Sequence, residues 1–313
     1  MGTATRVPQT RDMIGSELSA DEAWMTLRRY GNWALVRDAF LRFRYADGFT
    51  HSRALALQVV LSILPLAIAV VGLSRIVHTE DFGRVVSLVI GRLSSGPSSS
   101  VVEDTLQGAS EGSALAMSLG LAFALVNIAT AMSAIERGAN RIYGAERDRP
   151  FQHKYGRALG MTVIVGIPHG IGSVLAVAGG AIVDAMAEVY GWGDTQRAVW
   201  TALYWPIGIT LALLSACAIF RWSPRRRQPG FTWLAFGAAV YLGLWTLATW
   251  LLSLYVQVSG SFDRVYGPLS SFVLLILWVY VTSIALFLGL AFAAQLEAVR
   301  AHIKEPIEPD PGV

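Results

Sequence analysis

Histidine and carboxylate clusters are the residues that could supply metal-dependent or acid–base chemistry. The chain has five histidines, which stand far apart in the sequence: His51, His78, His153, His169 and His302. The sequence contains no HExxH or P-loop motif. Its single cysteine, Cys217, lies in an apolar run. We therefore predict a protein that is not an enzyme, with no catalytic residues, no metal site and no cofactor.

One histidine has an unusual position. The stretch GIPHGIG, residues 166–172, places His169 near the middle of a long apolar segment. An ionisable group at the centre of a membrane helix is a functional candidate by default. Pro168 lacks an N–H, so the carbonyl of Ile164 loses its helical partner and the helix is expected to kink. These features make the segment a candidate for the wall of a pathway.

A packed helix is the alternative interpretation of the same segment. It carries a surface of small residues, which suits close contact between helices: Gly166, Gly170, Gly172, Gly179 and Gly180. A neutral His169 could form a hydrogen bond across that surface. The sequence leaves both interpretations open.

Other polar residues and prolines lie inside apolar segments. Candidates for a polar interior, besides His169 and Pro168, are Gln58, Ser62, Pro65, Asn127, Tyr204 and Pro206. Transporters build binding sites from helices that are broken near the middle of the bilayer, and prolines tolerated by neighbouring helices are the alternative. The stretch SGSFDRVYGP adds Asp263, Arg264 and Tyr266, either as local loop contacts or as a gate.

These residues must be positioned by membrane helices. The chain of 313 residues is 54% hydrophobic and only 15% charged, which is too apolar for an ordinary soluble domain. About 20 helical residues cross a hydrocarbon core. Six segments are long enough and contain no Asp, Glu, Lys or Arg: 54–74, 114–135, 158–183, 199–220, 233–255 and 270–294. We predict an all-α fold with six transmembrane helices.

The distribution of basic residues predicts the orientation. If both termini are cytoplasmic, the segments on the inner side hold 19 Lys and Arg, and the segments on the outer side hold four. The predicted parts are a cytoplasmic N-terminal region (1–51), a six-helix domain (52–296) and a disordered cytoplasmic tail (297–313). No signal-peptide core precedes the first span, so no cleavage is expected. The basic loop RWSPRRR is expected to meet anionic lipid headgroups rather than a specific nucleic acid.

The N-terminal region contains an amphipathic stretch, DEAWMTLRRYGNWALVRDAFLRFR. Arginines alternate in it with apolar residues: Trp24, Leu27, Trp33, Val36, Phe40 and Phe43. Such a helix lies on a membrane surface or packs its apolar stripe against other parts of the protein. Both arrangements bury the same stripe, so the sequence does not choose between them.

Several motifs, taken in order, resemble the YihY/BrkB family of bacterial inner-membrane proteins. LSILPL matches the Ser-x-x-Pro of the family's first span. NRIYGAERDRPF matches the motif after the second span, through Asn140, Tyr143, Gly144 and Arg149. The fifth span is similar at Gly237, Ala238 and Trp245, and the last at Tyr266, Gly267, Trp278, Tyr280 and Gly289. Where many relatives then have Glu and Asn, this chain has Ala291 and Ala293, so a role that rests on that glutamate is in doubt here.

The resemblance implies a multi-pass protein of the bacterial inner membrane, although the family's former name, ribonuclease BN, is not supported by any metal-binding pattern in this sequence. We predict a transporter, exporter or flippase of an amphipathic or lipid-like molecule, with membrane lipids as its partners. The alternative is a non-catalytic scaffold or assembly partner in the envelope. Oligomeric state, substrate and coupling ion stay open.

Overall fold

The computed structural model describes residues 3–9, 18–76, 78–93, 114–145, 151–259 and 269–308. Within these ranges all regular structure is helical, apart from one isolated bridge between Ala4 and Ile307. The helices are α1 (Ala20–Tyr30), α2 (Asn32–Tyr45), α3 (Gly48–Ile76), α4 (Glu80–Leu93), α6 (Ala114–Ile142), α7 (Phe151–Met161), the π-helical turn η2 (Thr162–Gly166), α8 (Ile167–Tyr190), α9 (Asp194–Trp222), α10 (Phe231–Ser259) and α12 (Ser270–Arg300).

Six of these helical stretches are long and apolar enough to cross a membrane, which confirms the predicted fold class. They are Gly48–Ser74, Ser118–Ile142, Gly156–Tyr190, Asp194–Trp222, Phe231–Val258 and Phe272–Arg300. Most extend beyond the uncharged runs at one or both ends, because a helix continues past the bilayer core until a turn or a cap stops it. The third span is the longest and joins α7, η2 and α8 into one continuous helix.

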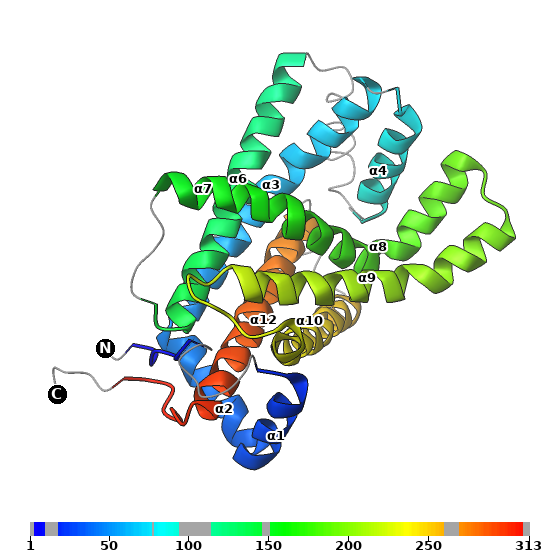
Figure 1. The fold of residues 1–313 in the computed structure, drawn as a ribbon. Coiled ribbons are helices and arrows are strands. Elements are labelled where there is room, and N and C mark those ends of the chain that lie inside the picture. Colours follow the sequence, from blue (N-terminus) through cyan, green and yellow to red (C-terminus); the bar gives the residue numbers. More distant parts are fainter. Residues whose placement is uncertain are drawn as a thin grey trace.

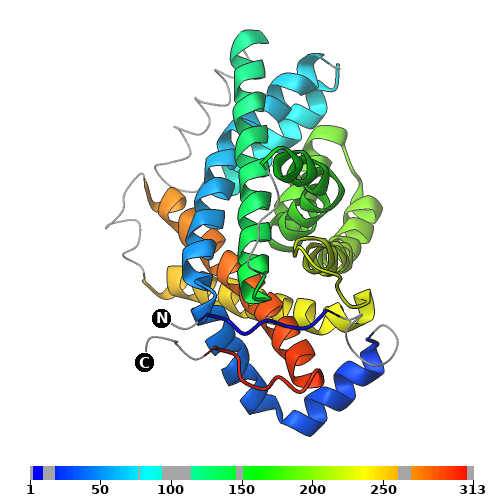
Figure 2. The ribbon, with the colours of Figure 1, turned by 60° about the vertical axis from the view of Figure 1, so that its left-hand side comes forward.

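The spans pack as three neighbouring pairs: α3 with α6, α8 with α9, and α10 with α12. Helix α12 also contacts α2 and α3, so it lies at the centre of the bundle (Figure 1). The short helix α4 packs against both α3 and α8 and bridges two of the pairs. Both chain ends lie at the same end of the molecule, beside α2 (Figure 2). We call this the terminal end.

Glycines bring two helix pairs into backbone contact. A Cβ atom added at Gly172 of α8 would lie 2.8 Å from the carbonyl oxygen of Gly208 on α9. One added at Gly237 of α10 would lie 2.6 Å from the carbonyl oxygen of Gly289 on α12. No side chain fits at these distances, so the pairs depend on glycine.

Fewer glycines of the third span therefore take part in close helix packing than the sequence indicated. Gly172 faces α9 as described, and a Cβ at Gly179 would meet the ring of Tyr204. By contrast, Gly170 and Gly180 have open space where a Cβ would go. A Cβ at Gly166 would make ordinary contact with Met132 of α6, so close approach to another helix requires glycine only at Gly172 and Gly179.

The C-terminal segment differs from the expected disordered tail. Residues 297–300 belong to α12, and the chain then reverses through His302, which has a φ of 64°. Residues 303–308 lie beside the N-terminal segment, where the N–H of Thr5 donates to the carbonyl of Pro306 (3.1 Å) and that of Glu308 to the carbonyl of Thr3 (2.8 Å). Composition alone indicated disorder, because the partner segment that satisfies this backbone is about 300 residues away. Residues 309–313 lie outside the described ranges.

Candidate functional site

The third span changes its winding immediately before Pro168. Residues Thr162–Gly166 form a π-helical turn, and the N–H of Ile167 donates to the carbonyl of Thr162, five residues back. Pro168 then follows as the second residue of α8, where it has no N–H to donate to the turn before it. The proline is thus accommodated by a wider turn in front of it. Turns of this kind are frequent at functional positions in helices.

His169 follows this turn and contacts another span. Its Nε2 lies 3.1 Å from the hydroxyl oxygen of Tyr241 on α10, and the two ring centroids are 5.7 Å apart. Tyr241 is fully buried. The other ring nitrogen, Nδ1, is enclosed without a well-formed hydrogen bond to any described residue. The structure therefore places a polar pair between α8 and α10 inside the membrane-spanning region.

The other predicted polar residues of the spans bond mostly within their own helices. The Ser62 hydroxyl donates to the carbonyl of Val59 (2.7 Å), and the Asn127 amide donates to the carbonyl of Phe123 (2.8 Å). Gln58 is half-buried on α3. These contacts satisfy the polar groups locally and do not join them to His169.

The two remaining prolines do not break their helices. Helix α3 continues through Pro65, and α9 continues through Pro206. Of the two alternatives that the sequence left open, the continuous helices agree with prolines that are tolerated by their surroundings. Tyr204, two residues before Pro206, packs its ring on Gly179 of α8.

The family-motif residues that end α6 hold the terminal end together. The side-chain oxygen of Asn140 accepts the backbone N–H of Arg225 (2.7 Å), and Tyr143 is buried beneath the guanidinium of Arg226, whose carbon lies 4.6 Å from the ring centroid. Gly144 has a φ of 67° and touches the backbone of Arg6, so it requires glycine.

Further motif residues divide between the spans and the part of the chain that is not described. Trp278 of α12 donates from Nε1 to the Thr249 hydroxyl of α10 (3.1 Å). Ala291 and Ala293 are fully buried in α12, and Ala293 lies close to Gly237, so both positions are occupied by helix packing. Lying outside the described residues are Arg149, Asp263, Arg264, Tyr266 and Gly267.

A buried arginine at the terminal end was not singled out from the sequence. Arg42 of α2 has no exposed surface. Its guanidinium donates to the side chain of Gln295 (2.8 Å), to the carbonyl and hydroxyl of Thr5 (both 2.7 Å) and to the carbonyl of Ile142 (3.0 Å). Burial lowers the pKa of Arg42 to about 10, so it stays charged at neutral pH. One side chain thus joins α2, α6, α12 and the N-terminal segment.

A buried ion pair lies in the same cluster. The guanidinium of Arg226 pairs with the carboxylate of Glu297, with side chains 4% and 0% exposed, and also donates to the carbonyl of Pro8 (2.7 Å). Burial, reinforced by the Glu297 charge, raises the pKa of Tyr143, which stays neutral. We call Arg42, Tyr143, Arg226, Gln295 and Glu297 the terminal cluster. Its sequence signal was the pair Gln295 and Glu297 inside an otherwise apolar helix end.

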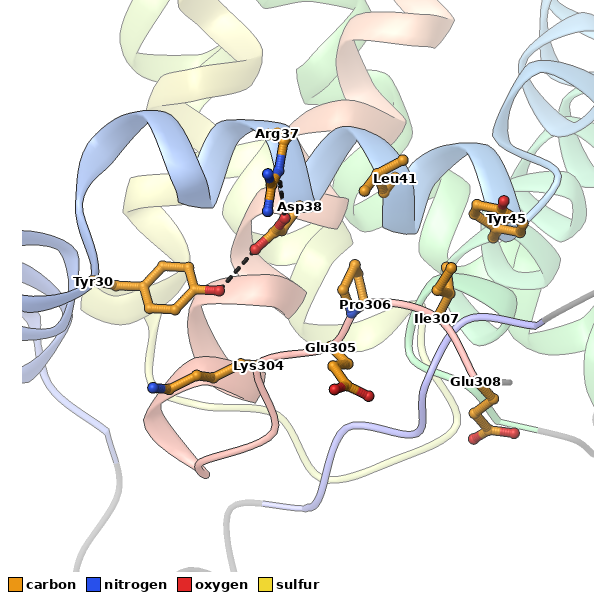
Figure 3. Close-up of a pocket in the computed structure, with 10 residues that line it drawn as sticks. All are labelled: Tyr30, Arg37, Asp38, Leu41, Tyr45, Lys304, Glu305, Pro306, Ile307 and Glu308. Atoms are coloured by element: carbon orange, nitrogen blue, oxygen red, sulfur yellow. Dashed lines mark hydrogen bonds and ion pairs between the residues drawn. The ribbon is translucent and has the colours of Figure 1, made fainter. Parts of the chain in front are cut away.

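A groove of about 540 Å³ opens at the terminal end between α2 and the C-terminal segment (Figure 3). The Tyr30 hydroxyl points at Asp38 and donates to it (2.7 Å), while Arg37 pairs with the other oxygen of the same carboxylate (3.1 Å). Burial and the Asp38 contact raise the pKa of Tyr30 to about 12. The remaining lining is mixed: Leu41, Tyr45, Lys304, Glu305, Pro306, Ile307 and Glu308. No group of three or more His, Cys, Asp or Glu within the described ranges could hold a metal ion.

Six apolar spans, a polar pair between two of them and a charged cluster at one end define a multi-pass integral membrane protein of all-α class. The family model for Virulence factor BrkB matches residues 39–312, and the chain belongs to this family. No solved structure matches the chain significantly.

Three curated relatives show how far the similarity extends. The chain is 23% identical over 264 residues to the ribonuclease-like protein YfkH of Bacillus subtilis (strain 168), covering 82% of this chain and 92% of that protein. It is 24% identical over 189 residues to the UPF0761 membrane protein IL2447 of Idiomarina loihiensis, covering 60% of this chain and 64% of the relative. It is 26% identical over 299 residues to the UPF0761 membrane protein Smlt0865 of Stenotrophomonas maltophilia (strain K279a), covering 91% of this chain and 66% of the relative. The prediction that this chain is not an enzyme stays a prediction.

Proposed function

We propose that this protein moves an amphipathic or lipid-like molecule across or out of the bacterial inner membrane. The observation that carries the proposal is the π-helical turn η2, followed by Pro168 and the His169–Tyr241 contact inside a membrane span. Irregular winding and a polar pair between helices are costly in a bilayer and mark places where spans change position.

The packing supports movement of α8 and α9 as one unit. Their backbones touch at Gly172 and Gly208, so these two helices hold together closely. The polar contact of α8 with α10 is made by the Tyr241 hydroxyl, which meets His169 and also lies within hydrogen-bonding reach of Ser173 on α8. A hydrogen bond of this kind is worth only about 0.6–1.7 kcal/mol in a membrane. We infer that η2 serves as the hinge and that the His169–Tyr241 contact holds the unit in the observed position.

Leaflet exchange in vesicles tests this function. The full chain, reconstituted with fluorescent lipids in anionic and zwitterionic vesicles, is expected to exchange lipids faster than protein-free vesicles do. Tyr241→Phe removes the hydrogen bond but keeps the ring, so exchange should become about three- to eighteen-fold faster. Ser62→Ala is the matched control, because it removes a bond within one helix and should leave the rate unchanged.

The outcomes separate the two functions. Exchange that is no faster than in protein-free vesicles, across all lipids tested, would favour the scaffold. If the wild type exchanges lipids but Tyr241→Phe and Ser62→Ala change the exchange rate equally, the His169–Tyr241 contact has no specific role in exchange.

Orientation is a separate prediction. We propose that both termini are cytoplasmic, because the segments on that side carry most of the Lys and Arg. Reporter fusions after residues 145, 225 and 305 should report cytoplasm, and fusions near 100, 192 and 264 should report the outer side. A single inverted fusion contradicts the six-span topology.

A further inference from the structure

Helices α1 and α2 leave a row of large apolar side chains uncovered. The exposed fractions are 48% for Trp24 and Met25, 81% for Trp33, 47% for Val36 and 45% for Phe40. Trp33 is the clearest case of an uncovered side chain, because exposing most of a tryptophan to water costs free energy. We call α1 and α2 the elbow.

The residues of α2 divide into distinct faces around the helix. At about 100° per residue, the exposed apolar face of Trp33, Val36 and Phe40 is centred roughly 110° from the core face, which holds Leu35, Ala39, Arg42 and Phe43. Arg44 and Arg37 follow about 60° further round. The groove face with Leu41 and Tyr45 comes next. An apolar face that is bordered by arginines on its outer side is the arrangement of a helix lying in a membrane interface.

The chain path keeps this face near a bilayer. Helix α2 ends at Tyr45, and the first span begins at Gly48. Three Cα–Cα steps separate Tyr45 from Gly48, and they reach no more than about 11 Å. Whatever the orientation of the protein, the end of α2 therefore stays at the level of the lipid headgroups.

Cations accompany the exposed apolar residues. The guanidinium of Arg28 lies 4.8 Å from the ring centroid of Trp24, and that of Arg44 lies 5.8 Å from the ring of Tyr45. Arg28 and Arg29 are both exposed. Arginine stems that cover aromatic rings leave the guanidinium free to meet phosphate groups. Two acidic side chains of the elbow have partners: Glu22 pairs with Arg300, and Asp38 contacts Tyr30 and Arg37. The third, Asp21, lies in the first turn of α1.

We propose that the elbow binds the surface of a bilayer that contains anionic lipids. Trp33, Val36 and Phe40 enter the boundary between headgroups and acyl chains. Arg28, Arg29 and Arg44 bind the lipid phosphate groups. This interaction surface is independent of transport, since it requires neither movement of α8 nor the His169–Tyr241 contact.

Site-directed quenching tests the proposal on the full chain. Cys217→Ala removes the single cysteine. Val36→Cys then places an environment-sensitive fluorophore on the apolar face, and Leu41→Cys places it on the groove face as the matched control. In vesicles with about 30 mol % phosphatidylglycerol, spin-labelled lipids should quench the label at 36 about threefold or more strongly than the label at 41.

A second experiment tests whether lipid binding requires the arginines of the elbow. In the triple variant Arg28→Gln, Arg29→Gln and Arg44→Gln, the phosphatidylglycerol fraction that gives half-maximal quenching at 36 should rise about threefold or more. Equal quenching at 36 and 41 overturns the proposed face. Quenching that does not depend on phosphatidylglycerol overturns the role of anionic lipid. Energy transfer between labels at 36 that rises with protein density, without lipid quenching, assigns the face to a second copy of the chain instead. Because quenching is read separately from leaflet exchange, failure here leaves the transport proposal unaffected.

Discussion

Replacing Glu297 with alanine is expected to destabilise the protein by about 3–5 kcal/mol, because it leaves the guanidinium of Arg226 buried without its carboxylate. The loss of stability is expected to be larger because the second guanidinium of the terminal cluster, that of Arg42, is also fully buried. Unfolding by heat or by denaturing detergent, followed on purified protein in mild detergent, measures the effect.

Two control variants test whether the loss of stability comes from a buried charge without its partner. Glu22→Ala breaks the partly exposed pair with Arg300 (3.4 Å) and should cost less than about 1 kcal/mol. The double variant Arg226→Met with Glu297→Leu removes both charges and should be less harmful than Glu297→Ala alone. If Glu297→Ala and Glu22→Ala had similar small effects, the terminal cluster would not hold the helix ends together.

Replacing Gly172 with leucine is expected to separate α8 from α9. A Cβ at this position would lie 2.8 Å from both the backbone N of Ala212 and the carbonyl oxygen of Gly208, and backbone atoms cannot move aside as a flexible side chain does. Overpacking costs about 1–3 kcal/mol where side chains can shift, and more is expected here. The melting temperature should fall, and leaflet exchange should be lost if the two helices move as one unit.

Gly170→Leu is the matched control, two residues away on the same helix. It has open space where a Cβ would go, so stability should change little. Equal loss of stability in the two variants would show that the glycines matter for the helix itself rather than for its contact with α9.

The terminal cluster gives a physical reason for the family motif after the second span. Asn140, Tyr143 and Gly144 hold the α9–α10 loop and the N-terminal segment against the end of α6. Arg42 and Gln295 extend the same contacts to α2 and α12. The groove and the elbow are therefore attached to the spans through a rigid end, whereas the π-helical turn lies in the membrane-spanning part of the chain.

The sequence by itself determined the six spans, because a bilayer core of about 30 Å requires long uncharged helices, and few segments in any chain can provide them. It also indicated the amphipathic elbow and the position of His169. These features are local: each depends on the composition of one continuous segment.

Only the tertiary structure decided which polar groups meet. Sequence cannot distinguish buried Arg42 from exposed Arg44, two residues away, because its partners Thr5, Ile142 and Gln295 come from distant segments. The same holds for residues 303–308, which find their partner at the other end of the chain, and for Tyr241, which no motif joined to His169. Burial and hydrogen bonding are properties of the assembled helices, so an isolated segment does not carry the information.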